Sequence, residues 1–270
     1  MRSKLSLVLI SAAVFLWVGA MITASPVTAQ EELKYACSNQ VYKAFEKEKL
    51  EAFTQKTGIK VKVYTASSPS CVYRLMHGYS DIASTARALY RRHADYGFAQ
   101  IPICKDPLAV IAKKGCEVDN LSEQQLQDIF SGEITNWKEV GGVDLPITVM
   151  VPDKDTAANK NFRRQIMKDK EIQHHFETYD STMVLEAVKY FPCGTISFIG
   201  QGAVTKYEEI KTLKIDGRLP TDKDYPYHQV FYYITKGEPS GTAKEFIDFT
   251  FSQEGQNIIR KNGMLPLSRW

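Results

Sequence analysis

Residues 60–76 read KVKVYTASSPSCVYRLM. Apolar and polar residues alternate from Lys60 to Thr65, which is typical of a half-buried strand. The pair Ser68-Pro69 then predicts a helix start, with the serine as N-cap and the proline as the first helical residue. The first N–H groups of a helix lack intrahelical partners and, together with the helix dipole, favour an anion. The stretch therefore indicates either an ordinary capped turn or an anion-binding loop.

Similar strand-to-helix passages flank this stretch. A strand at residues 33–36 leads into Ser38-Asn39-Gln40 and a helix, and a strand beginning at Asp81 ends in a polar segment with Arg87. The order β-α-β-α-β predicts a parallel sheet with helices on its faces. Because ligands bind beyond the carboxyl ends of such strands, we expect Ser38, Ser68 and Arg87 at one edge of the sheet.

The second half of the chain predicts a second lobe. Residues 101–112 read as an extended pass broken by a turn at Lys105-Asp106-Pro107, and residues 225–235 read as a return pass. Between them, a strand at 146–151 leads through the polar loop Pro152–Thr156 into a helix at 157–168. A mature chain of about 240 residues also exceeds a typical single core and favours two lobes.

The N-terminus predicts export. Arg2 and Lys4 precede a mostly apolar run, and Val27-Thr28-Ala29 follows as a small-residue exit, so residues 1–29 read as a secretory signal peptide. The apolar run is long enough that an uncleaved membrane anchor is the alternative. Either way we expect a periplasmic or secreted protein. The 34 basic residues lose Arg2 and Lys4 on cleavage and then face 31 acidic ones, so no basic stripe for nucleic acid is indicated.

The cysteines predict disulfides, because an exported chain meets oxidising conditions. If the first two strands are neighbours, Cys37 and Cys71 lie at adjacent turns and can be bridged when their Cα atoms are within about 7 Å. The odd count leaves at least one thiol over, and a thiolate site for a metal or soft ligand that uses Cys193 as well is the alternative. Other pairings among the set remain open; the five cysteines are Cys37, Cys71, Cys104, Cys116 and Cys193.

Several stretches resemble one known family. They are FSGEITNW at 130–137 followed by Gly141-Gly142, the tail from FIDF at 246–249 to GMLPL at 263–267, and DIASTARAL at 81–89. Together they resemble the periplasmic phosphate-binding proteins of ABC importers, PstS-like proteins with the type II periplasmic binding protein fold, over about residues 33–268. The resemblance implies an α/β fold of two lobes, each a mostly parallel sheet flanked by helices, joined by a two-strand hinge. We expect lobe 1 at 30–104 and 228–270, and lobe 2 at 105–227.

The resemblance also implies a ligand site between the lobes. Its expected residues are Ser38, Asn39, Gln40, Ser67, Ser68, Ser70, Cys71, Arg87, Asp155 and Thr156. The chain departs from the family pattern at Pro69 and Cys71, and in the third loop, where the usual Arg-x-x-x-Ser-Gly-Thr is replaced by residues 152–158. Asp155 there opposes a dianion unless Lys160, Lys154 or Arg87 offsets its charge.

Two functions follow from these observations. The first is a solute-binding protein that captures phosphate or a similar oxyanion and delivers it to an ABC permease. The second is a PstS-like accessory subunit with a decayed site, which binds another exported protein or a soft or metal ligand through cleft cysteines. No nucleophile–base arrangement and no cofactor motif is visible in the sequence, so neither an enzyme nor a cofactor is expected.

Overall fold

The computed structural model describes residues 31–90, 96–115, 117–168 and 170–268. The predicted signal peptide, residues 1–29, lies outside these ranges. Residues Glu31–Trp270 form one compact unit. Within the described ranges, none of the helices has both the length and the apolar character that a membrane span requires.

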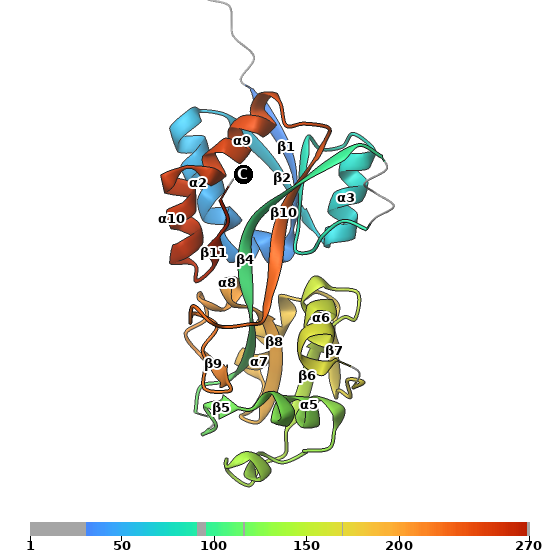
Figure 1. Ribbon diagram of the computed structural model, residues 1–270, viewed down its shortest axis with the longest axis vertical. Coiled ribbons are helices and arrows are strands. Elements are labelled where there is room, and N and C mark those ends of the chain that lie inside the picture. The colour runs from blue at the N-terminus through green and yellow to red at the C-terminus, as the bar shows by residue number, and fades with distance from the viewer. Residues whose placement is uncertain (1–30, 91–95, 116, 169, 269–270) are drawn as a thin grey trace, which may run out of the picture. The chain divides into compact units, whose positions relative to one another are not determined.

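The first lobe contains the strands β2-β1-β3-β10-β4, in this order, of a continuous mixed sheet, and β11 pairs with β4 (Figure 1). The first three of these strands are parallel, as predicted, and β10 runs antiparallel to both of its neighbours. A π-helical turn at Tyr42–Glu46 joins α1 and α2 into one continuous helix. The elements of this lobe are β1 (Glu32–Ser38), α1 (Asn39–Val41), α2 (Lys47–Thr57), β2 (Lys60–Ala66), α3 (Ser68–Met76), β3 (Ile82–Thr85), β10 (His228–Lys236), α9 (Gly241–Phe251), α10 (Gln253–Lys261) and β11 (Leu265–Pro266).

Apolar side chains cover both faces of this sheet. Tyr35 and Phe53 belong to a core with Phe246 and Phe249 of α9, whereas Leu75 of α3 packs with small residues of β1 and β3 on a separate core. Figure 1 shows α2, α9 and α10 on one side of the sheet and α3 on the other. The carboxyl ends of β1 and β2 therefore open toward the starts of α1 and α3.

The second lobe has its own core, which includes Phe130, Trp137, Phe162 and Phe198. Strand β8 runs parallel to β6, β6 runs parallel to β7, and β9 runs antiparallel to β4. The elements are β5 (Asn120–Leu121), α5 (Glu123–Ser131), a 3₁₀ turn (Trp137–Val140), β6 (Thr148–Pro152), α6 (Ala157–Phe162) with a π-helical extension (Arg163–Met167), β7 (Phe176–Thr178), α7 (Met183–Tyr190), β8 (Thr195–Gly200), α8 (Gln201–Val204) and β9 (Ile210–Ile215).

Strands β4 (Phe98–Lys113) and β10 connect the two sheets (Figure 1). Strand β4 pairs with β10 from Phe98 to Pro107 and with β8 from Leu108 onward, so its partner changes between these two residues. This arrangement confirms the two-lobed fold with a two-strand hinge. The exact lobe boundaries that we expected from the sequence remain a prediction.

The predicted turn at Lys105-Asp106-Pro107 is wrong, because β4 continues through it as a strand. The Asp106 carboxylate, which is fully buried, accepts hydrogen bonds from the Gly202 backbone N–H and from Gln229 Nε2, each at 2.9 Å. These partners satisfy a polar side chain that would otherwise be costly inside the sheet. A turn sequence can therefore remain extended here.

The predicted Cys37–Cys71 disulfide is also wrong. Cys37, Cys71 and Cys104 are buried free thiols, so each pairing that involves one of them is absent. Cys37 packs in the core beneath α2, whereas Cys71 packs beneath α3 on the other side of the sheet. Successive side chains of a strand point to opposite faces, and Ala36 of β1, not Cys37, faces the core that contains Cys71. Cys116 lies outside the described residues, so its pairing with Cys193 remains a prediction.

Candidate functional site

A cavity of about 490 Å³ opens where α1 and α3 of the first lobe and α6 of the second lobe begin. It lies at the carboxyl ends of β1, β2 and β6, the edge predicted from the sequence. Its walls contain most of the expected site residues, namely Ser38, Asn39, Gln40, Ser67, Ser68, Ser70, Arg87, Asp155 and Thr156. Cys71 is the expected residue that does not line it.

The start of α1 places a buried amide donor at the cavity. The backbone N–H of Ser38 donates to Ser84 Oγ at 3.2 Å, which ties the end of β1 to β3. Gln40 is only 3% exposed, and its Nε2 has no hydrogen-bond partner among the described residues. A buried donor without a partner is unfavourable, so this amide nitrogen is suited to a bound acceptor.

The start of α3 differs from the prediction by one residue. Ser67, not Ser68, is the N-cap, and its Oγ accepts from the Ser70 N–H at 3.4 Å. Ser68 is the first helical residue, and its Oγ accepts from the Ala86 N–H at 3.2 Å. Because this contact uses a lone pair, the hydroxyl proton of Ser68 remains available for an acceptor in the cavity.

Cys71 lies one turn into α3 and faces away from the cavity. Its N–H donates to the carbonyl of Ser67 at 3.0 Å, and its side chain is fully buried. Burial raises the pKa of the Cys71 thiol to about 12. Burial also raises the pKa of the Cys37 thiol well above its usual range. These buried, protonated thiols remove the basis for the predicted soft-ligand site, and the described residues contain no group of three side chains that could hold a metal ion.

The third loop comes from the second lobe. Thr156 is the N-cap of α6, and its Oγ1 accepts from the Asn159 N–H at 3.3 Å and donates to the Asp153 carbonyl at 2.7 Å. The Thr156 hydroxyl is therefore committed to the turn. Asp155 pairs with Lys160 at 2.8 Å, and this hydrogen bond and charge hold the pKa of the Asp155 carboxyl below its usual range. Lys160 thus supplies the offsetting charge that we expected.

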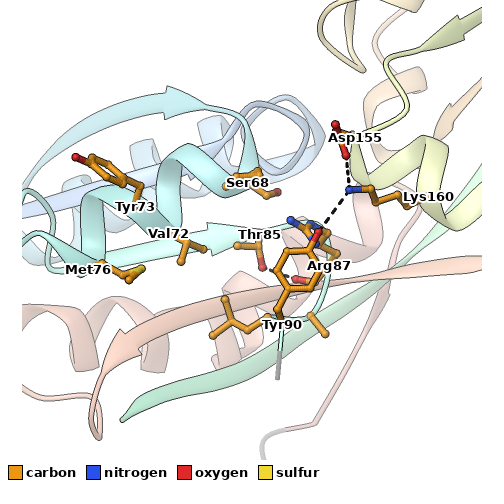
Figure 2. A pocket seen from close by; sticks show the side chains of 12 residues that line it. Ser68, Val72, Tyr73, Met76, Thr85, Arg87, Tyr90, Asp155 and Lys160 are labelled. Atoms are coloured by element: carbon orange, nitrogen blue, oxygen red, sulfur yellow. Dashed lines mark hydrogen bonds and ion pairs between the residues drawn. The ribbon is translucent and has the colours of Figure 1, made fainter. Parts of the chain in front are cut away.

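Arg87 extends from the end of β3 toward the second lobe. Its guanidinium lies over the ring of Tyr90, 4.2 Å from the centroid, and the Tyr90 hydroxyl is 3.5 Å from Lys160 Nζ (Figure 2). Slight burial opposes ionisation of Tyr90, but the hydrogen bonds and charges of Arg87 and Lys160 outweigh it and lower the tyrosine pKa. Asp81, which directly precedes β3, accepts a hydrogen bond from the Lys34 backbone N–H at 2.7 Å.

Sequence reasoning missed the loop before α7. Tyr179, Asp180 and Ser181 line the cavity, and Asn39 Nδ2 donates to Asp180 Oδ2 at 2.6 Å, which is a direct bond between the lobes. The other carboxylate oxygen of Asp180 accepts from the Thr182 N–H at 2.8 Å. Asp-Ser-Thr before a helix is a recognisable start signal, and it could have added this loop to the site.

The cavity combines donors with carboxylates. Helix starts, the Gln40 amide, the Ser68 hydroxyl and Arg87 offer positive charge or protons to an anion. Asp153, Asp155 and Asp180 bring negative charge to the same walls. This balance is better suited to a protonated or singly charged oxyanion than to a bare dianion, because a ligand hydroxyl can donate to a carboxylate.

Comparison with known proteins identifies relatives over most of the chain. The PBP superfamily domain matches residues 23–254. A crystal structure from Clostridium perfringens, with bound phosphate and assigned to phosphate ABC transport as a substrate-binding protein, is 25% identical with a TM-score of 0.77; the match covers 88% of this chain and all of that one. An ABC-type phosphate transport receptor from Vibrio cholerae has a TM-score of 0.65 and covers 86% of this chain and 99% of that one at 24% identity, which supports the fold.

Two curated relatives agree with this result. The phosphate-binding protein PstS of Bacillus subtilis is 29% identical over 60% of this chain, and the PstS of Borreliella burgdorferi is 25% identical over 69% of it. The match spans 55% of the Bacillus protein's length and 72% of the Borreliella protein's length. The two-lobed fold and the cavity between the lobes agree with the match to the superfamily domain. The chain belongs to the PBP superfamily.

Proposed function

We propose that this protein is an exported solute-binding protein that captures phosphate or a similar oxyanion between its lobes and presents it to an ABC permease. It binds the ligand and releases it unchanged. The proposal draws support from the relatives named phosphate-binding protein PstS and from the phosphate-bound Clostridium structure.

The observation that carries the proposal is the unpaired donor of Gln40 beside the starts of α1, α3 and α6. The amide nitrogen is buried without a partner in the described part of the chain, and Gln40 is one of the residues that line the cavity. Helix starts from both lobes face the same cavity, and Arg87 adds a guanidinium. An oxyanion would give each of these donors an acceptor.

The Asn39–Asp180 bond supports a closing motion around the ligand. It joins the start of α1 in one lobe to the loop before α7 in the other. A ligand that contacts both lobes stabilises the closed arrangement by its differential affinity for it, and a permease can then recognise the closed form.

Binding of phosphate to the purified protein tests the proposal. Calorimetric titration with phosphate, arsenate, molybdate and sulfate should give saturable binding of at least phosphate at micromolar protein. Arg87→Met should weaken binding at least about tenfold, because a charge-assisted contact is lost. The matched control is Arg218→Met, an exposed arginine that pairs with Asp224 in the second lobe. Absence of binding for all four anions would overturn the proposal.

A second candidate function rests on the acidic walls of the cavity. In this alternative the negative charge of three wall residues, Asp153, Asp155 and Asp180, prevents phosphate binding. The protein then serves as an accessory subunit for another exported protein. This candidate predicts no phosphate affinity in the same titration and a stable complex with that partner.

A further inference from the structure

A second hollow of about 460 Å³ adjoins the cavity of the proposed site (Figure 2). The two share Ser68, Pro69, Arg87 and Asp155 in their walls. The hollow lies almost wholly on the first lobe, between α3 and the segment that follows β3. Lys160 and Asp155 are its contributions from the second lobe.

The hollow is polar at one end and apolar at the other. Ser68, Thr85, Arg87 and Asp155 form the polar end, where the Arg87 guanidinium is stacked on Tyr90. Away from that end the lining side chains are apolar or aromatic; they are Val72, Tyr73, Met76, Ala88 and Leu89. Figure 2 shows Val72 and Met76 along α3, with Arg87, Tyr90 and Lys160 at the other end.

A simple oxyanion leaves this space unused. The oxygens of such an ion hydrogen-bond to polar groups, and the first cavity already supplies these. The apolar hollow gains nothing from such an ion, whereas an apolar group that enters it displaces water from Val72, Met76 and Leu89. A ligand that fills both spaces must therefore carry an anionic head and an apolar substituent.

We propose that the protein binds organic phosphomonoesters or phosphonates, with the anionic head at Ser68 and Arg87 and an apolar or aromatic substituent between Val72, Met76 and Leu89. The inference rests on the proposed function, because it places the head group in the same site. Arg87 is suited to this role because it lines both spaces and carries a positive charge. The ring of Tyr90 forms the side of the hollow next to this guanidinium.

Two phosphonates of matched charge test the inference. Calorimetric titration compares methylphosphonate with phenylphosphonate, and inorganic phosphate serves as the reference for the proposed function. Burial of the phenyl ring should make phenylphosphonate bind roughly ten- to a hundredfold more tightly than methylphosphonate.

A substitution at the wall of the hollow tests whether the preference for phenylphosphonate arises there. Ala88 is exposed, lines the hollow and is not part of the first cavity's wall, so Ala88→Trp should fill the hollow without disturbing the fold. The expected result is loss of the phenyl preference with phosphate affinity unchanged. Ala88→Ser is the matched control and should keep the preference.

If Ala88→Trp fails to fold, Met76→Gln replaces it. This variant should reduce the preference at least about threefold, because the phenyl ring would then displace water from a polar amide at a cost in free energy.

The outcomes separate the two proposals. Equal affinity for both phosphonates, or phosphate binding without phosphonate binding, overturns the inference and leaves the proposed function intact. A phenyl preference that survives in both Ala88→Trp and Met76→Gln also overturns it. Absence of binding for phosphate and for both phosphonates overturns both proposals together.

Discussion

The side-chain amide of Asn39 donates a hydrogen bond of 2.6 Å to the carboxylate of Asp180. The two residues lie at helix starts in different lobes and both line the central cavity. The bond therefore joins the two lobes at the wall of the candidate site.

Removal of this bond should speed ligand release. Asn39→Ala deletes a charge-assisted contact in a half-buried position, which contributes about 1 kcal/mol. We expect the dissociation rate of bound phosphate to rise roughly fivefold, measured by stopped-flow competition. Asn257→Ala in α10, away from the cavity, is the control. An unchanged release rate would show that the bond has no part in holding the lobes closed.

Two buried glutamines should respond in opposite ways to the same substitution. Gln40 Nε2 has no partner among the described residues, whereas Gln127 Nε2 donates to the Ile166 carbonyl at 2.8 Å. Gln40→Leu should therefore stabilise the ligand-free protein by about 1 kcal/mol, and Gln127→Leu should destabilise it by a similar amount. Urea unfolding measures both changes.

The Gln40 variant should also lose its response to ligand. A bound ligand stabilises the folded state in proportion to its affinity, so phosphate should raise the melting temperature of the unmodified protein and of the Gln127 variant. Gln40→Leu should show little increase. A full phosphate-induced increase in this variant would mean that the buried amide does not contact the ligand.

The hinge carboxylate Asp106 should make stability depend on pH. Burial raises the pKa of this carboxyl to about 7, although hydrogen bonds from Gly202 and Gln229 oppose the shift. The unfolded chain releases this proton near pH 4, so the folded protein binds more protons between about pH 4 and 7. The free energy of unfolding should therefore fall across this range, by at most about 4 kcal/mol from this group.

Asp106→Asn removes that titration. The new amide can donate to Gln229 Oε1, which is buried without a partner among the described residues, and its carbonyl can still accept from Gly202. Chemical unfolding at pH 5 and pH 8 should then show a smaller difference than in the unmodified protein. Asp224→Asn, at an exposed position, should keep the original difference. Identical pH profiles for the Asp106 variant and the unmodified protein would contradict the assignment.

A buried lysine in the first lobe should be costly to remove alone. Lys49 and Glu46 are fully buried 3.3 Å apart, and Lys49 Nζ donates to Thr250 Oγ1 at 2.7 Å and also contacts the Tyr233 hydroxyl. Lys49→Met leaves the Glu46 charge unpaired and should destabilise the protein by about 3–5 kcal/mol in urea unfolding. The double variant Lys49→Met with Glu46→Leu should recover most of that loss, since no buried charge is left. A double variant as unstable as the single one would show that the tyrosine and threonine contacts matter more than the charge pair.

Much of the fold could be predicted from local sequence signals. The alternation from Lys60 to Thr65 and the serine–proline start identified β2 and α3, and Gly58 stops α2 with a φ of 75°, which glycine adopts readily. Those signals involve residues that are close in the sequence, so they can be recognised without the tertiary structure. They also placed Ser38, Ser68 and Arg87 at the wall of the cavity, because the carboxyl ends of parallel strands meet at one edge.

What the sequence could not supply depends on contacts between distant residues. Cys37 lies near the end of β1 and Cys71 lies in α3 after β2, but the two thiols pack in cores on opposite faces of the sheet. Asp106 reads as a turn residue until Gly202 and Gln229, about a hundred residues away, become its hydrogen-bond partners. Asp180 joins the site through Asn39. Each of these relationships arises from tertiary packing, which no short motif records.

The paired crossing of β4 and β10 has a consequence for how the lobes can move. The two strands pair from Phe98 and Lys236 to Pro107 and His228, with one register shift between Phe231 and Tyr232. Such a ribbon flexes across its flat face without stretching its ladder hydrogen bonds, whereas bending within its plane would break them. Bending across the flat face of the ribbon should therefore be an easy motion between the lobes. One pair of spectroscopic probes across the cleft would follow this bending.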